Sequence, residues 1–128
     1  LVQIGIRAAT RQQREMAAKH RIQVIEMKDI DQALRLDFSH PVYVSFDMDS
    51  LDPAFAPGVS HQEPAGLTTR QVIDIFHAMC GEIVGMDVVE LNPERDPSGI
   101  TAAAAVKIIK EVAAQVVLSR KYRKREVP

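Results

Sequence analysis

Apolar and polar stretches alternate along this chain in a way that predicts strands and helices in turn. Short runs rich in β-branched and aromatic residues predict four strands, at Leu1–Ile6, Ile22–Met27, Pro41–Phe46 and Ile83–Leu91. Apolar positions at helical spacing predict three helices, from Thr10 to about Lys19, after Thr68 as far as Cys80, and from about Ser98 to Leu118, with a short helix or turn at Asp29–Leu36. This order favours a parallel α/β sheet with right-handed crossovers.

Two capping patterns support the helix starts. Thr10 is followed three residues later by Gln13, and Thr68 by Gln71, and this spacing lets each side chain bond to the backbone of the other. Between the third strand and the second helix, Asp47–Leu67 contains Pro53, Pro57 and Pro64, which predict one long irregular loop. Loops of this length in compact domains are usually functional.

Composition limits the classes of protein that fit. A chain of 128 residues that is 46% hydrophobic can bury one core, so we expect residues 1–128 to form a single domain or one piece of a larger domain. The net charge of −1 argues against nucleic acid or an anionic membrane as a partner, and no apolar run reaches the ~18 residues of a membrane span. The basic tail at 120–128 predicts a solvated terminus, with nucleic-acid binding as the weaker alternative.

Cys80 is the single cysteine, so an internal disulfide is excluded and a reducing, cytoplasmic location is expected. We interpret Cys80 itself as a small apolar filler on a helix face. The chain opens at Leu1, without Met, directly in a predicted strand, which we interpret as a strand separated from a preceding segment.

Carboxylates follow two of the predicted strands. In open parallel sheets ligands gather at the carboxyl ends of strands, where Asp47 and Asp49 end the third strand and Glu90 ends the fourth. In an extended backbone residues i and i+2 lie on one face, roughly 6.5 Å apart, so both aspartates would reach one metal ion or a pair of ions. The alternative is that Asp-x-Asp only begins a turn, as we expect of Asp52 before Pro53.

Longer motifs around these residues decide between the two interpretations. Ser45-Phe46-Asp47-Met48-Asp49-Ser50-Leu51-Asp52-Pro53, continued by Ala54-Phe55-Ala56-Pro57-Gly58 and by Gly66-Leu67-Thr68, closely resembles the Asp-rich signature of the ureohydrolase family, which includes arginase, agmatinase, guanidinobutyrase and formimidoylglutamase. Val84-Gly85-Met86-Asp87-Val88-Val89-Glu90-Leu91-Asn92-Pro93 resembles the second signature of that family. The resemblance extends from Ile4-Gly5-Ile6-Arg7 to the final helix, and the loop at His61-Gln62-Glu63-Pro64 is most similar to plant-type arginases. It implies a three-layer α/β fold, of which this chain is the C-terminal portion.

The resemblance also implies an activity and roles for residues. Asp47 and Asp49 would be catalytic ligands of a dimanganese cluster, which activates a shared water for attack on a guanidino carbon. Glu90 would hold the guanidinium of the substrate bidentately, the alternative being a buried acid paired with an arginine. His61 would line the substrate entrance or would be an exposed loop histidine.

Three further residues carry weaker expectations. Arg7 ends the first strand and is expected to pair with an acid near the site, and His77 is expected to be structural or on the surface. Ala65 stands where family members commonly have glycine, which puts the shape of the loop in question.

The other metal ligands of the family lie in upstream Gly-Gly-Asp-His and Asp-Ala-His-x-Asp segments, which do not occur in these 128 residues. We therefore expect the chain to be part of a dimanganese ureohydrolase, with arginine as the favoured substrate and agmatine as the next. The fragment alone is expected to be inactive. The resemblance implies a homo-oligomer, a trimer or a hexamer. The alternative function is a truncated, non-catalytic arginase-like fold that serves as an assembly partner.

Overall fold

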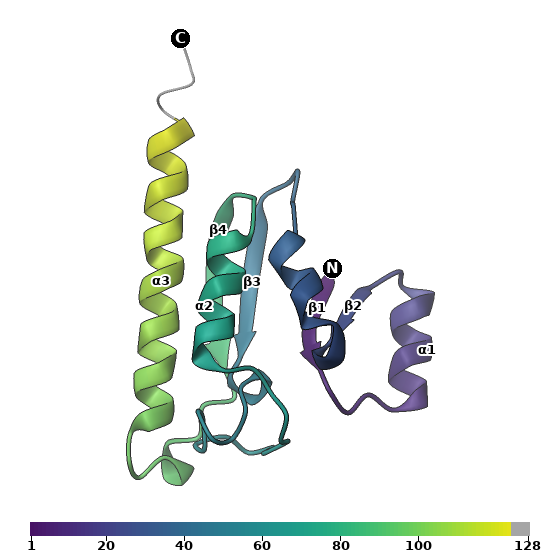
Figure 1. The fold of residues 1–128 in the computed structure, drawn as a ribbon, viewed down its shortest axis with the longest axis vertical. Helices are drawn as coiled ribbons and strands as arrows, with labels where there is room; N and C mark the ends of the chain where they lie inside the picture. The colour runs from purple at the N-terminus through teal and green to yellow at the C-terminus, as the bar shows by residue number, and fades with distance from the viewer. Residues whose placement is uncertain (124–128) are drawn as a thin grey trace.

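The four predicted strands and the three predicted helices are all present in the computed structural model, which describes residues 1–123 (Figure 1). In chain order the elements are β1 (Val2–Ile6), α1 (Arg11–Lys19), β2 (Gln23–Glu26), η1 (Met27–Arg35), β3 (Val42–Asp47), η2 (Met48–Ser50), α2 (Thr69–Ala78), β4 (Ile83–Val89), η3 (Pro93–Arg95) and α3 (Ile100–Arg123), where η marks a 3-10 helix. The side chains of the basic tail predicted at 120–128 lie outside the part of the chain that the structure describes, so the prediction of a solvated terminus is not tested.

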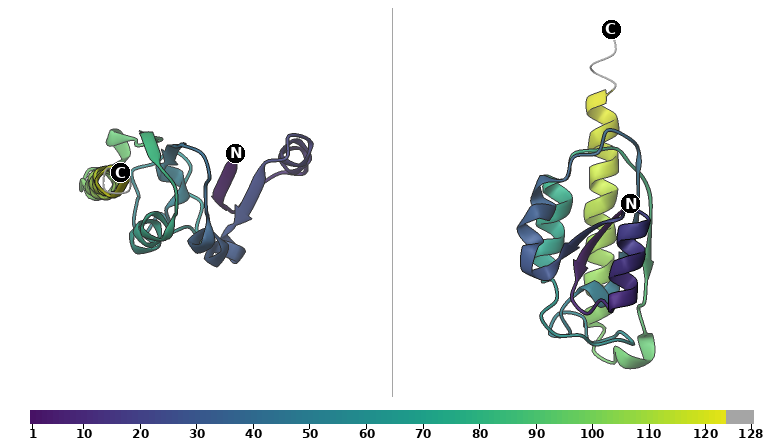
Figure 2. Two further views of the ribbon diagram at one scale, coloured as in Figure 1. Left: turned by 90° about the horizontal axis from the view of Figure 1, so that it is seen from above. Right: turned by 90° about the vertical axis from the view of Figure 1, so that its right-hand side faces the viewer.

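The strands pair in parallel, as expected, but as two separate pairs. β1 lies beside β2, with Ile4 opposite Ile25, and β3 lies beside β4, with Ser45 opposite Asp87. Among the described residues the two pairs do not join into one sheet, and Figure 2 shows them side by side. The parallel α/β fold class is confirmed, and among the described residues neither outer edge of either pair has a neighbouring strand.

Helix α2 forms the centre of the core. Both expected capping boxes are present, so Thr10 accepts from the backbone N–H of Gln13, and Thr68 accepts from that of Gln71. Four residues of α2 are buried, namely Val72, Ile73, Ile75 and Phe76. Val72, Ile75 and Phe76 belong to one core cluster with residues of β3, η2 and α3, and the ring centres of Phe46 and Phe76 lie 6.3 Å apart, with the rings tilted by 55°. This packing fixes the carboxyl end of β3 against a helix, which anchors the residues that follow it.

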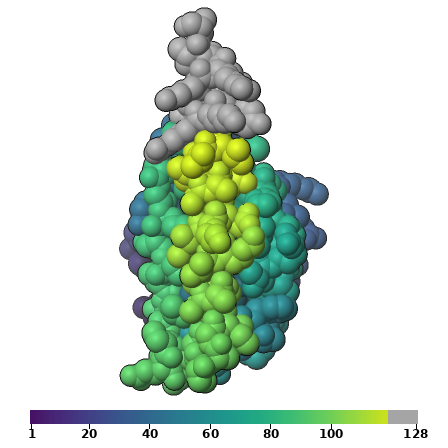
Figure 3. All heavy atoms as spheres, turned by 90° about the vertical axis from the view of Figure 1, so that its left-hand side faces the viewer, coloured from purple at the N-terminus to yellow at the C-terminus, as the bar shows by residue number. Residues whose placement is uncertain are grey.

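Helix α3 packs against α2 and β4, with Ala105, Ile108 and Val112 buried. Its opposite side is open to solvent, as Figure 3 shows. Two apolar residues of α3 are largely exposed, Val106 at 56% and Val117 at 65%. Within the described chain, α1 has no buried residue. No helix among residues 1–123 is both long enough and apolar enough to cross a bilayer.

Two smaller expectations have different outcomes. His77 lies on the exposed side of α2, where its Nε2 is 2.9 Å from Glu111 Oε2 on α3, so it is a surface histidine as expected. The assignment of Cys80 to a helix face was wrong. Cys80 follows α2 and is exposed, and its backbone bonds to Leu36 and Phe38 because the chain is already turning into β4.

Candidate active site

The two neighbouring aspartates sit at the carboxyl end of β3, but not in the extended geometry predicted from their spacing. The chain turns into η2 directly after Asp47, and Asp47 Oδ1 accepts a hydrogen bond of 2.8 Å from the backbone N–H of Asp49. The extended i, i+2 arrangement was therefore wrong, because Asp47 caps a 3-10 turn. Asp49 lies within that turn, so the direction of its side chain is set by η2 rather than by the strand.

Asp52 closes the start of the long loop, as expected of a turn residue. Its Oδ1 accepts from the N–H of Ala54 at 2.9 Å and its Oδ2 from that of Gly66 at 3.1 Å. The backbone N–H of Asp52 also donates to the carbonyl of Leu67 at 2.8 Å. These bonds bring the two ends of the loop together, so that residues 53–65 project as one unit.

The outer part of the loop is tied to the segment that follows β4. The N–H of Gly58 donates to Thr101 Oγ1 at 2.7 Å, and the carbonyl of Gly58 accepts from the N–H of Asn92 at 2.8 Å. Asp96 caps the start of α3 by accepting from the N–H groups of Thr101 and Ala102, at 3.1 Å and 2.8 Å. The loop, the end of β4 and the start of α3 are thereby held in one arrangement.

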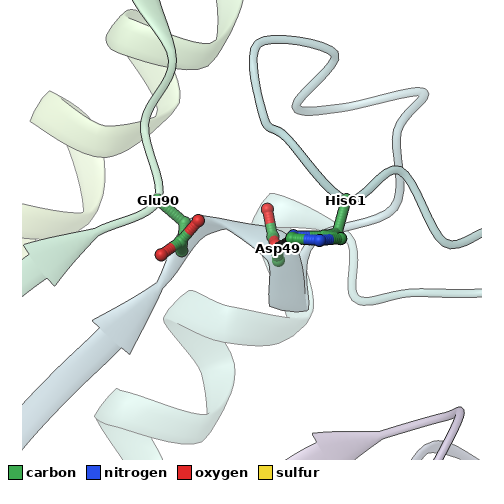
Figure 4. Close-up of side chains that lie close together, drawn as sticks. All are labelled: Asp49, His61 and Glu90. Carbon is green, nitrogen blue, oxygen red and sulfur yellow. Dashed lines mark ion pairs between the residues drawn. The ribbon is translucent and has the colours of Figure 1, made fainter.

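This arrangement brings together three side chains from three segments. One ligand atom each of Asp49, His61 and Glu90 lies within 4.8 Å of the other two. His61 Nδ1 is 3.4 Å from Asp49 Oδ2, and Figure 4 shows the carboxylate of Asp49 between Glu90 and the imidazole ring. Asp47, Asp49, Glu90 and His61 had been predicted for the site, and Asp47 is the one outside this cluster of three.

Glu90 has an unusual backbone for a residue with a side chain. Its φ is +66°, in the left-handed region, and the residue follows directly after β4. Such conformations cost free energy in residues other than glycine and concentrate at functional sites. The strained backbone directs the carboxylate of Glu90 toward Asp49, and the side chain is exposed, so the alternative of a buried acid paired with an arginine does not fit.

The electrostatics around Asp49 suit a bound cation. Burial raises the pKa of Asp49, the neighbouring carboxylates of Asp47 and Glu90 raise it further, and His61 acts in the opposite direction. Asp49 Oδ1 is buried and has no hydrogen-bond partner among the described residues. A divalent cation would supply that missing partner and would remove the repulsion among the carboxylates. Carboxylate and imidazole ligands are a donor set that manganese accepts, so the residues present fit the metal implied by the resemblance.

A cleft of about 920 Å³ opens beside the cluster. It runs between β1, α1 and β2 on one side and Asp47, Asp49 and His61 on the other. The side chain of His61 is 84% exposed and lies at its rim. His61 is therefore an exposed loop histidine that borders the cleft, and its place at a substrate entrance stays a prediction.

The role of Arg7 was predicted incorrectly. Its guanidinium donates to the backbone carbonyls of Asp49 at 2.7 Å, Ser50 at 2.9 Å and Glu63 at 2.8 Å, and not to a carboxylate. The sequence signals only that a cation follows a strand, and the acceptors come from segments more than 40 positions away. Backbone acceptors leave no side-chain signature, so pattern reasoning could not find them.

Comparison with known proteins places this arrangement in a family. Residues 1–114 match the model of the arginase family. The chain belongs to the arginase family. Arginase from Medicago truncatula, named as mitochondrial, is 46% identical over 124 residues, an alignment covering 91% of this chain and 37% of that protein. An agmatinase from Chromobacterium violaceum is 54% identical over 69 residues, covering 53% of this chain and 21% of the agmatinase.

Solved arginase-family structures share the fold. The structure of Medicago truncatula arginase superposes with a TM-score of 0.85 at 45% identity, over 91% of this chain and 39% of that one. Proclavaminate amidino hydrolase from Streptomyces clavuligerus gives a TM-score of 0.79 at 34% identity, over 90% of this chain and 42% of that one. The chain spans little more than a third of the length of the first plant arginases it matches. The expected similarity to plant-type arginases is confirmed.

One expectation is contradicted by the same relatives. The lone cysteine led us to expect a cytoplasmic location, whereas the similar arginases of Medicago truncatula, rice and Arabidopsis thaliana carry names that place them in mitochondria, and one in chloroplasts or mitochondria. The expected cytoplasmic location is therefore contradicted by the names of these relatives. A single cysteine excludes an internal disulfide, and it does not distinguish one reducing compartment from another.

Proposed function

We propose that residues 1–128 are the C-terminal part of a single-domain, dimanganese ureohydrolase that hydrolyses a guanidino compound to urea and an amine. The observation that carries the proposal is the cluster of Asp49, His61 and Glu90 at the carboxyl ends of two parallel strands, in a member of the arginase family. Ligands gather at this end of parallel sheets.

Asp47 and Asp49 are the residues of this chain that would hold manganese. Asp49 has a buried oxygen without a protein partner, and Asp47 uses one carboxylate oxygen to cap η2, which leaves the other for a ligand. When bound, manganese lowers the pKa of a coordinated water so that it becomes a nucleophile near neutral pH. The remaining ligands would come from segments upstream of residue 1.

Glu90 would bind the substrate. A guanidinium is planar and presents paired N–H groups, which a carboxylate accepts in two parallel, charge-assisted hydrogen bonds. The carboxylate of Glu90 lies on the side of Asp49 opposite His61 (Figure 4), so a guanidinium held there would have its carbon close to Asp49. The strained backbone of Glu90 presents the carboxylate in this direction before substrate arrives, which lowers the entropic cost of orienting the substrate.

Arginine is the favoured substrate and agmatine the next. The preference for arginine rests on the loop at His61, which is most similar to plant arginases, one of them 46% identical over 124 residues. Agmatine is the second candidate substrate because an agmatinase is 54% identical to this chain over 69 residues. We also propose a homo-oligomer, a trimer or hexamer, as the assembly.

The deciding experiment is a urea-release assay of a full-length protein that contains residues 1–128 and the upstream ligand segments. The manganese-loaded protein is given arginine, agmatine and 4-guanidinobutyrate in parallel, and a sample stripped with chelator serves as the control. We expect urea from arginine above the others and loss of activity without manganese. A manganese-loaded protein that releases no urea from any guanidino compound would refute the proposal and favour the non-catalytic assembly partner.

A further inference from the structure

Arg7 connects three separate segments at the edge of the site. It follows β1, and its Nη2 donates to the carbonyls of Asp49 at 2.7 Å and Glu63 at 2.8 Å, while Nη1 donates to the carbonyl of Ser50 at 2.9 Å. A longer contact of 3.5 Å joins Nη1 to the carbonyl of Gly5 in β1 itself. One guanidinium therefore ties the end of β1 to η2 and to the loop that carries His61.

The hydrogen bonds of Arg7 are made to the backbone segments that carry Asp49 and His61. Asp49 and Ser50 are two of the three residues of η2, so holding their carbonyls fixes the turn from which the Asp49 carboxylate projects. Glu63 lies two residues after His61, and its backbone N–H donates to the carbonyl of His61 at 3.2 Å, so the bond from Arg7 to Glu63 holds the backbone beside His61. Arg7 does not rely on the side chains of these residues, since its acceptors among the described residues are backbone oxygens.

The requirement is specific to arginine. A guanidinium is planar and presents five donors in a fixed fork, whereas the ammonium of lysine is a point charge with three donors on a flexible stem. The Nη groups of Arg7 reach three acceptors at 2.7–2.9 Å, two carbonyls in η2 and one in the loop that carries His61. Lysine would retain the positive charge but would satisfy fewer of these carbonyls at once.

We infer that Arg7 is a positioning residue for manganese, which acts through the backbone of Asp49, Ser50 and Glu63 to hold the Asp49 carboxylate in its ligating orientation. This inference rests on the proposed function. Residues outside the first coordination shell that orient a ligand typically change metal affinity about 10- to 100-fold when they are replaced. Loss of the Arg7 fork should have an effect of this size.

The test compares Arg7→Gln and Arg7→Lys with the unaltered full-length protein. Manganese affinity is measured by calorimetric titration and by electron paramagnetic resonance of free Mn²⁺, alongside thermal unfolding of the metal-free proteins and urea release. Arg11→Gln is the matched control, because Arg11 is 93% exposed and, within the described residues, forms an ion pair with Glu15 of α1 alone. We expect a manganese affinity about 10- to 100-fold weaker in Arg7→Gln, a smaller loss in Arg7→Lys, and none in Arg11→Gln.

The outcomes separate this inference from the function it rests on. If the unaltered protein releases urea but Arg7→Gln retains its manganese affinity within about twofold, Arg7 does not position the metal ligand. A purely structural role would lower the unfolding temperature and leave the affinity of the folded fraction unchanged, which also contradicts the inference. If Arg7→Gln does not fold, the affinity of Arg7→Lys decides. If the unaltered protein binds manganese without releasing urea, the proposed function fails while the positioning effect can still be measured.

Discussion

Gly58 and Asp96 approach each other more closely than any other residue at position 58 would permit. A Cβ atom added to Gly58 would lie 2.4 Å from the Cβ of Asp96 and 2.9 Å from Thr101 Oγ1. Both neighbours are buried and fixed by the cap of α3, so neither can move aside. The close approach lets the loop bond to Thr101 and Asn92 and so holds His61 near Glu90.

We predict that Gly58→Ala destabilises the fold and weakens the site together. Overpacking of a fixed contact typically costs about 1–3 kcal/mol of unfolding free energy, and the loop that carries His61 would shift away from α3. Denaturant unfolding and urea release of the full-length protein provide the two measurements.

Gly85→Ala is the matched control for that prediction. A Cβ there would meet only ring atoms of Tyr43, at 3.0 Å, and this ring can turn away because Tyr43 is 61% exposed. Both substitutions restrict the unfolded chain equally, so the difference between them isolates the contact with Asp96. Equal destabilisation by the two substitutions would contradict the prediction.

Local patterns in the sequence predict the elements of this fold well. The two capping boxes mark the starts of α1 and α2 because the interaction spans only three residues, as with Thr68 and Gln71. Pairing between distant strands is a different matter. Nothing in the strand sequences reveals that β1–β2 and β3–β4 form separate pairs, since pairing depends on which neighbours are present in space.

The same limit applies to the site. The carboxylates Asp47, Asp49 and Glu90 follow strand ends and are visible from residue type and position alone. The 3-10 turn that moves Asp49 out of line with Asp47 results from a side-chain cap, and the fork of Arg7 depends on backbone acceptors more than 40 positions away. Interactions of both kinds are set by tertiary structure rather than by periodicity.

Asp96 makes the stability of the fold depend on pH in the acid range. Burial raises the pKa of Asp96, but the N–H groups of Ala102 and Thr101 outweigh burial and hold the pKa below its ordinary value of 3.8. A depressed pKa means that the charged carboxylate stabilises the fold fully above the ordinary value, and that this contribution is lost as pH falls through the lowered one.

We therefore predict that Asp96→Asn lowers the unfolding temperature at neutral pH, and that its difference from the unaltered protein narrows in acid. The amide of asparagine carries no charge and offers one acceptor oxygen in place of two. Thermal unfolding followed by circular dichroism from about pH 7 down to about pH 3 would show the narrowing. A difference that stays constant over this range would show that the charge of Asp96 contributes nothing.

Ala65 and Glu90 share a left-handed backbone, with φ of +62° and +66°. Glycine adopts this conformation without strain. We predict that Ala65→Gly and Glu90→Gly each raise the free energy of unfolding by about 0.5–1 kcal/mol. Relief of backbone strain of about 1–2 kcal/mol exceeds the entropic cost of ordering a glycine.

The two variants should differ in activity. Ala65→Gly should retain urea release, whereas Glu90→Gly should lose it, since it removes the carboxylate proposed to hold the guanidinium. Denaturant titration and urea assays on both proteins provide the comparison. Destabilisation by Glu90→Gly would mean that the backbone at residue 90 is not strained.

Asp49 and Glu90 should respond differently to removal of charge. Asp49→Asn should lower manganese content, because it replaces a carboxylate whose buried oxygen has no other partner in the described chain. Glu90→Gln should leave manganese in place and reduce kcat/KM about 10- to 100-fold, the effect of losing a hydrogen bond between charged groups. Asp74→Asn, exposed on α2, serves as the control. Equal loss of manganese in both variants would make Glu90 a metal ligand.

The last prediction concerns residues 1–128 expressed alone. Among the described residues each strand pair has an edge without a neighbour, α1 buries no residue, and α3 exposes Val106 and Val117 on its outer side. Open strand edges and exposed apolar surface favour association, and the carboxylates of one cluster complete only part of a two-ion site. The isolated chain should therefore bind manganese weakly, release no urea and self-associate. Light scattering after size exclusion and calorimetric titration with manganese test this prediction. A monodisperse monomer that binds two ions tightly would contradict it and would show that this chain contains every metal ligand it needs.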